Sequence, residues 1–125
     1  MTAVQRLDQV GAGPVGYAGV SMGCGLGIPL IVAEPRIQAA VLGLLGVAGL
    51  AEDAARITVP VRFLVQWDDR QVPRDQSLAL FDALGSAEKT LHANPGGHGE
   101  VPSFEIDDAL SFFTRHLSRP AGRRA

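Results

Sequence analysis

The five residues from Gly19 to Gly23, G-V-S-M-G, constrain the fold of this chain more than any other stretch. They fit the pattern G-x-S-x-G between an apolar segment typical of a short strand, 15–18, and a small-residue segment typical of a helix, 24–33. A serine on a tight strand-to-helix turn is held in a strained backbone conformation with its hydroxyl exposed. We expect glycine at positions 19 and 23 because side chains there would clash. The following helix directs its N-terminal N–H groups toward any negative charge that forms near Ser21.

The remaining chain alternates apolar strand-like runs with helix-like segments. This alternation is typical of a parallel α/β sheet, in which ligands lie beyond the carboxyl ends of the strands. The nearly continuous apolar run at 37–45 is expected for a strand that is covered on both faces. The predicted strands after the serine turn are Ile37–Leu45, Val61–Gln66 and Lys89–Ala93, and the predicted helices are one or two turns within 50–56, Arg74–Leu84 and Pro102–Leu117.

The last predicted helix has an apolar face that we expect to pack inward, formed by Phe104, Ile106, Ala109, Leu110, Phe112, Phe113 and Leu117. At the other end, residues 2–9 resemble the end of an amphipathic helix. Residues 11–16 spell G-x-G-x-x-G, but a dinucleotide fingerprint should follow a strand and open a helix. Here the pattern leads into a strand, so we interpret it as a loop.

Three chemically useful groups each follow a predicted strand, which predicts that they share one edge of the sheet. They are Ser21, the pair Asp68–Asp69, and His98 within G-G-H-G. A serine hydroxyl becomes an effective nucleophile when a base removes its proton, and His98 is the candidate base. A carboxylate would fix the tautomer of the imidazole and stabilise its cationic form. The order Ser, Asp, His along the chain fits such a triad, with the N–H of Met22 as one oxyanion donor.

These motifs resemble the C-terminal half of an α/β-hydrolase, in the neighbourhood of dienelactone-hydrolase-like proteins and small esterases. The resemblance runs from about residue 15 to residue 117 and includes G-V-S-M-G, D-R-Q-V-P at 69–73, and G-H-G at 97–99. D-x-x-V-P is the aspartate loop of this family, so the resemblance assigns the triad acid to Asp69 and leaves Asp68 as the alternative. We also expect Trp67 and Val72 to line the substrate site, with plain packing beside a strand end as the alternative for Trp67.

Two departures from the family are expected to matter. Dienelactone hydrolase has a cysteine as its nucleophile, whereas this chain has Ser21, and Cys24 lies in the helix, where we expect it only to pack. The family fold usually has eight strands, so the sequence predicts a partial fold of about four mostly parallel strands flanked by helices. The strands of the first half would be absent, together with the loop that supplies the second oxyanion donor. Either the chain is a piece of a longer enzyme, or it compensates by pairing with another chain at the open sheet edge, which predicts a homodimer through that edge.

Composition excludes several other classes of function. The 125 residues predict one domain, 1–118, followed by a mobile basic tail, 119–125. A net charge of −2 provides no basic surface for nucleic acid. We expect no membrane span and no signal peptide, and the single cysteine fits a cytoplasmic protein. The histidines are too scattered to suggest a metal site, and no cofactor is expected.

The sequence therefore predicts a serine hydrolase that acts on a small ester-like substrate through Ser21, Asp69 and His98. Two alternatives stay open. One is a truncated, non-catalytic fragment that is stable only by pairing with itself or with another chain. The other is a cofactor-free haloperoxidase-like or lyase activity on the same triad.

Overall fold

The computed structural model describes residues 13–117, in which four strands alternate with four helices. The helix expected within 2–9, the first two residues of the loop at 11–16 and the tail from 119 lie outside the described residues. The elements are β1 (Val15–Ala18), α2 (Met22–Ala33), β2 (Ile37–Gly43), α3 (Ala51–Arg56), β3 (Val61–Gln66), α4 (Arg74–Ala83), β4 (Lys89–Asn94) and α5 (Phe104–Leu117).

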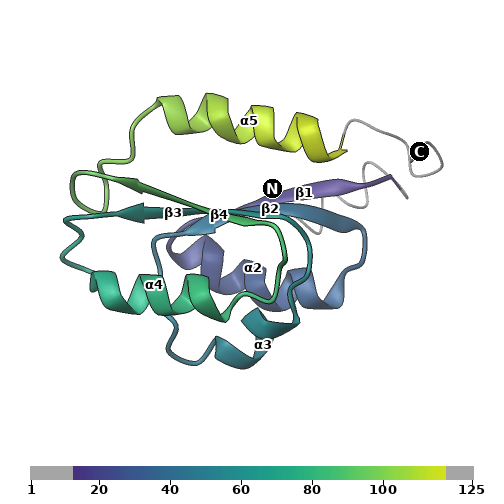
Figure 1. Cartoon of the computed structure of the whole chain (residues 1–125), viewed down its shortest axis with the longest axis horizontal. Helices are drawn as coiled ribbons and strands as arrows, with labels where there is room; N and C mark the ends of the chain where they lie inside the picture. Colours follow the sequence, from purple (N-terminus) through teal and green to yellow (C-terminus); the bar gives the residue numbers. More distant parts are fainter. Residues whose placement is uncertain (1–12, 118–125) are drawn as a thin grey trace.

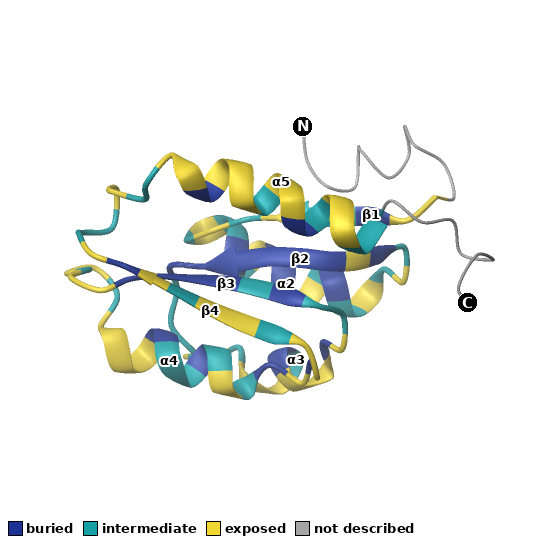
Figure 2. Ribbon diagram, turned by 45° about the horizontal axis from the view of Figure 1, so that its top comes forward, coloured by how far each residue is buried: buried dark blue, intermediate teal, exposed yellow. Residues whose placement is uncertain are grey.

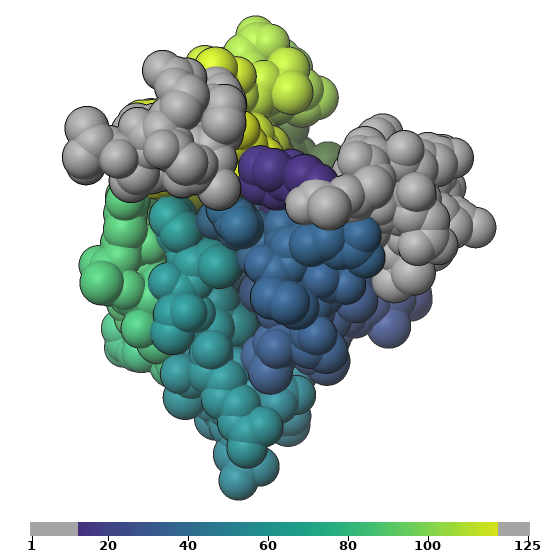
Figure 3. Space-filling model, turned by 90° about the vertical axis from the view of Figure 1, so that its right-hand side faces the viewer, coloured from purple at the N-terminus to yellow at the C-terminus, as the bar shows by residue number. Residues whose placement is uncertain are grey.

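The strands form one parallel sheet in the order β1-β2-β3-β4. Each strand reaches its neighbour through a crossover that contains a helix, and crossovers of one hand place successive helices on the same face. Accordingly α2, α3 and α4 lie on one face of the sheet, and among the described elements α5 is the one that covers the other (Figure 1). The predicted α/β architecture of about four parallel strands is confirmed. Viewed from the end where the strands begin, the start of β1 lies between α5 and the blue segment that leads into β2 (Figure 3).

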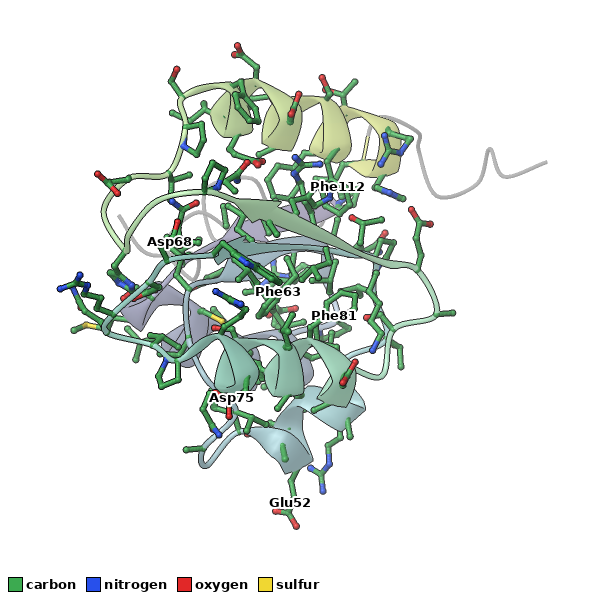
Figure 4. The ribbon with its side chains drawn as sticks, turned by 60° about the vertical axis from the view of Figure 1, so that its left-hand side comes forward. Glu52, Phe63, Asp68, Asp75, Phe81 and Phe112 are labelled. Carbon is green, nitrogen blue, oxygen red and sulfur yellow. The ribbon has the colours of Figure 1, made fainter. Side chains whose placement is uncertain are left out.

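The two faces of the sheet carry two apolar clusters. Along β3, Phe63 packs with Val61 and Val65 toward α2 and α4, whereas Leu64 packs toward α5 with Phe112. Figure 4 shows Phe63 and Phe81 on the α4 side of the sheet and Phe112 beneath α5. Strand β2 is buried on both faces except at one residue, as expected for an inner parallel strand (Figure 2).

The prediction for the apolar face of α5 is wrong at three residues. Ala109, Phe112, Phe113 and Leu117 pack against the sheet, but Phe104, Ile106 and Leu110 are exposed. The seven apolar residues cover more than one side of the helix, and only one side can face a single sheet layer. Phe104, Ile106 and Leu110 are therefore left exposed along α5.

Strand β2 ends earlier than predicted, at Gly43 instead of Leu45. Gly43 has a φ of +145° and Leu44 a φ of +56°, so the backbone leaves the extended conformation there. A Cβ at Gly43 would lie 2.2 Å from the backbone oxygen of Leu64, so glycine is required where the chain runs so close to β3.

Among the described residues, no helix is long and apolar enough to cross a membrane.

Candidate active site

Ser21 lies in a β-turn that joins β1 to α2. The N–H of Gly23 donates to the carbonyl of Val20 at 2.9 Å, which closes the turn, and the N–H of Ser21 donates to the carbonyl of Gly43 at 2.9 Å. Ser21 has φ 57° and ψ −122°. These angles belong to the first central position of a type II′ turn, which glycine normally occupies. A serine there carries backbone strain, as G-x-S-x-G predicted.

The two glycines of the motif have different roles. A Cβ at Gly19 would lie 2.6 Å from the backbone oxygen of Gly23, so the expected clash exists at position 19. At Gly23 an added Cβ would meet nothing within 4 Å, so the expectation of a clash at that position is wrong. Gly23 instead accepts a hydrogen bond from the Tyr17 hydroxyl through its carbonyl, at 2.6 Å. This bond attaches the start of α2 to β1.

The loop after β4 brings His98 to the serine. Its Nε2 lies 2.9 Å from Ser21 Oγ, and its Nδ1 lies 2.7 Å from Asp69 Oδ2. The three side chains thus form one continuous chain of hydrogen bonds, although 77 residues separate Ser21 from His98. The side chains of His98 and Asp69 are 17% and 4% exposed, so little water competes for these bonds.

Asp69 is held in its ionised form. Burial is the largest influence and raises its pKa, but hydrogen bonds from His98 and from the N–H groups of Val72 and Gln71 together lower the pKa below its ordinary value. Those two N–H groups donate to Oδ1 at 3.0 and 2.7 Å, which leaves Oδ2 for the imidazole. Asp69 can therefore fix the ring and stabilise its cation.

Asp68, the alternative acid, points elsewhere. Its Oδ2 accepts a hydrogen bond from the N–H of Gly96 at 2.9 Å. Figure 4 shows Asp68 at the end of the sheet from which the loops emerge. The structure thus brings Asp69 to the imidazole of His98, whereas Asp68 contacts the backbone of Gly96, which precedes His98.

The N–H of Met22 lies at the first position of α2, where backbone donors have no acceptor within the helix. Its side chain is largely exposed. This N–H follows Ser21 directly, as expected of a group that donates a hydrogen bond to a developing oxyanion.

The two residues expected to line the substrate site have different surroundings. Val72 borders an apolar cavity of about 280 Å³, together with Leu45, Leu50 and Pro73. Trp67 is partly exposed, and the guanidinium of Arg74 lies 3.9 Å from the centre of its ring. Trp67 does not border the cavity beside Val72. His98 itself borders a second, polar cavity of about 450 Å³.

Sequence reasoning missed a group of buried polar residues beneath the His98 loop. Glu105 pairs with Arg62 at 2.6 Å and accepts a hydrogen bond from Asn94 at 2.7 Å. Gln66, the last residue of β3, is also buried. A signal was present, because Arg62 and Gln66 interrupt an otherwise apolar strand at alternate positions, which places both on one face.

Cys24 packs in the apolar core, as expected for a residue of this helix. Cys24 is fully buried, and burial raises the pKa of its thiol to about 11, so it remains protonated at neutral pH. Within residues 13–117, no group of three or more His, Cys, Asp and Glu side chains is arranged to hold a metal ion.

Comparison with known proteins gives structural matches only. No family model matches the chain, and no curated protein matches it. A cold-adapted esterase from an Arctic intertidal metagenomic library is 39% identical, with a TM-score of 0.85 over 92% of this chain and 52% of its own. The acetyl xylan esterase from Paenibacillus sp. R4 is 17% identical, with a TM-score of 0.75 over 91% of this chain and 51% of its own.

A third match carries the name of the fold. An alpha/beta hydrolase enzyme from the metagenome of lagoon sediments at Mar Chica, Morocco, is 16% identical, with a TM-score of 0.73 over 90% of this chain and 66% of its own. The chain spans about half the length of the two esterases. The four-stranded parallel sheet, the serine turn and these matches all indicate the same fold. The chain therefore has an α/β-hydrolase fold, which it shares over about half the length of the two esterases.

Proposed function

We propose that this chain carries the nucleophile, base and acid of a serine hydrolase that cleaves small ester-like substrates. The observation that carries the proposal is the continuous hydrogen-bond chain from Ser21 through His98 to Asp69, with heavy-atom distances of 2.9 and 2.7 Å. The 39% identical Arctic protein is an esterase, which supports the same class of reaction.

In the first step, Ser21 Oγ attacks the carbonyl carbon of the ester while His98 Nε2 takes the hydroxyl proton. The carbonyl electron pair moves to oxygen, and the N–H of Met22 donates to the resulting oxyanion. Asp69 holds Nδ1 of the imidazole and stabilises its positive charge. When the tetrahedral intermediate collapses, the C–O bond to the alcohol breaks, and Nε2 returns its proton to the leaving alkoxide.

In the second step, water takes the place of the alcohol. His98 removes a proton from the water as its oxygen attacks the acyl-enzyme carbonyl. Collapse breaks the bond to Ser21 Oγ, which regains the proton, and the carboxylic acid leaves. The cycle consumes one water and needs no cofactor.

Small or mid-sized substrates fit the surroundings of this site. The segment between β2 and β3, residues 44–60, contains only the six-residue helix α3 and forms no large lid. The apolar cavity beside Val72, of about 280 Å³, suits a short hydrocarbon portion. A substrate panel in which only long-chain lipids react would contradict this substrate class.

A fluorophosphonate probe tests the proposed reaction. We expect stoichiometric covalent labelling at Ser21, lost in Ser21→Ala and His98→Ala and strongly slowed in Asp69→Asn. Asp68→Asn should label much faster than Asp69→Asn, because Asp68 does not contact the imidazole. Ser111→Ala, on the exposed side of α5, is the matched control and should label like the wild type. A folded protein that the probe does not label would support the rival non-catalytic fragment.

A second copy of the chain is the proposed partner at the open edge of β1. Strand β1 ends the sheet order, so its outer edge pairs with no strand of the described residues. Ile106 and Leu110 are 66% and 60% exposed, and on the surface of α5 they lie next to Phe113 and Leu117, whose side chains pack inward over Gly16 of β1. The exposed apolar stripe is therefore continuous with the unpaired edge.

A two-fold axis perpendicular to the sheet would pair two β1 strands and bring two such stripes together. Light scattering on the eluting protein should give twice the chain mass for the wild type and a lower mass for Leu110→Lys. Glu52→Lys, on the exposed surface of α3, is the control. A monomer at every concentration would exclude the dimer. The cytoplasmic location expected from the single cysteine stays a prediction.

A further inference from the structure

The His98 loop, residues 95–103, contains no helix or strand, yet its imidazole must stay within hydrogen-bond distance of two side chains. Backbone bonds hold its first residues. The N–H of Trp67 donates to the carbonyl of Asn94 at 2.7 Å, and that of Asp68 donates to the carbonyl of Gly96 at 3.0 Å. Both bonds precede Gly97. A third bond, from the N–H of Glu100 to the carbonyl of Gly97 at 3.0 Å, closes a turn within the loop and does not attach the peptide unit before His98 to the sheet.

Gln66 reaches that peptide unit. Its Nε2 donates to the carbonyl of Gly97 at 3.1 Å and to that of Pro95 at 3.4 Å. Both partners are carbonyl oxygens, so only the amino end of the amide can face them, and the orientation of the side chain is settled. The carbonyl of Gly97 belongs to the peptide bond whose nitrogen is that of His98.

The burial of Gln66 makes this contact informative. The residue is 1% exposed, and its Oε1 has no hydrogen-bond partner among the described residues. A buried amide with an unpaired oxygen is unfavourable compared with an apolar side chain of the same size. Packing alone therefore does not explain a glutamine at the end of β3, whereas the two bonds to the His98 loop do.

Two other side chains touch the same loop from more exposed positions. Asp68 accepts a hydrogen bond from the N–H of Gly96, and Glu100 accepts one from the N–H of Gly97. Because both contacts are solvent-exposed, water can replace these acceptors when the side chains are changed. Water has no such access to the buried amide of Gln66.

We propose that Gln66 is a positioning residue, which fixes the peptide between Gly97 and His98 so that the imidazole remains between Ser21 and Asp69. The proposal rests on the proposed function for its effect on rate, but not for its effect on the imidazole. Gln66 touches no reacting atom and acts only through the loop.

The test compares Gln66→Met with the wild type, because methionine matches the shape of glutamine and lacks the donor. Labelling of Ser21 by the fluorophosphonate should slow by about 10- to 100-fold, since a displacement of about 1 Å costs up to about 100-fold. The Nδ1 proton of His98, hydrogen-bonded to Asp69, should give a downfield NMR signal that is broadened or lost in Gln66→Met. Gln38→Met, the same change at an exposed position of β2, should alter neither measurement.

The outcomes separate the two ideas. A Gln66→Met protein with wild-type labelling and an unchanged downfield signal would overturn the positioning role. If the wild type is not labelled but the signal still depends on Gln66, the hydrolase proposal fails and the positioning role stands. Should Gln66→Met not fold, Gln66→Asn replaces it, because asparagine keeps the amide but is one methylene too short to reach Gly97. Asp68→Asn and Glu100→Gln should slow labelling less than either Gln66 variant.

Discussion

Replacing Ser21 by glycine should stabilise the protein relative to replacing it by alanine. Both changes remove the hydroxyl and its hydrogen bond to His98, so the difference between them isolates the effect of the Cβ. Ser21 has φ 57° and ψ −122°, a conformation that glycine adopts without strain. A side chain held in such a region costs about 1–3 kcal/mol.

The expected difference is smaller than this strain because glycine also loses more conformational freedom on folding, at a cost of about 0.5–1 kcal/mol relative to alanine. Ser21→Gly should therefore exceed Ser21→Ala by about 0.5–2 kcal/mol in the free energy of unfolding. With about 4 °C of melting temperature per kcal/mol for a chain of this size, thermal unfolding should resolve the difference. Urea titration of both variants at one pH gives the free energies directly.

The control pair is Ser111→Gly and Ser111→Ala. Ser111 lies in the interior of α5 and is exposed, so glycine should be less stable than alanine there, by about 1 kcal/mol. The sign of the glycine effect should thus be opposite at the two serines. If Ser21→Gly were no more stable than Ser21→Ala, the turn would store no strain and this account of the motif would be refuted.

Three further predictions concern stability. Gly43→Ala should destabilise the chain by well over the roughly 1 kcal/mol expected of Gly49→Ala, because both have positive φ but only Gly43 faces a backbone oxygen at 2.2 Å; equal effects in urea titration would contradict this. Glu105→Gln should cost about 3–5 kcal/mol at neutral pH. Burial raises the pKa of Glu105, but bonds from Arg62 and Asn94 lower it overall, so this contribution should be complete above about pH 4.3 and lost as the pH falls through the lowered pKa. A mutant-to-wild-type difference that grows on acidification would refute that sign. Phe63→Ala should cost about 3–5 kcal/mol, and a cost below 1 kcal/mol would show that the site collapses around the cavity.

Local patterns were sufficient for the order of the elements. The four strands and their helices follow from apolar runs and from stops such as Pro35 and Gly85, and the parallel arrangement follows from their alternation. The serine turn is predictable because its angles and its glycine at position 19 are required within five residues. Likewise, the two N–H groups that donate to Asp69 come from Gln71 and Val72, within the same motif D-R-Q-V-P.

Features that depend on distant partners were not predictable. Arg62 meets Glu105 across 43 residues, and no local pattern records that contact. The apolar residues of α5 were all expected to face the sheet because the sequence does not show how many layers cover a helix. Ile106 and Leu110 are exposed because a single layer leaves that side of α5 uncovered.

The nucleophile and its base emerge from opposite edges of the sheet. Ser21 follows β1 and His98 follows β4, with β2 and β3 between them. Adjacent strands are spaced by about 4.8 Å, so the two edge strands lie about 14 Å apart, and the 2.9 Å contact joins chain segments from both sides. Any molecule that alters the twist of the four strands would change the separation of these two atoms. The ability of His98 to take the proton of Ser21 therefore depends on the shape of the whole sheet, including strands that contribute no reacting group.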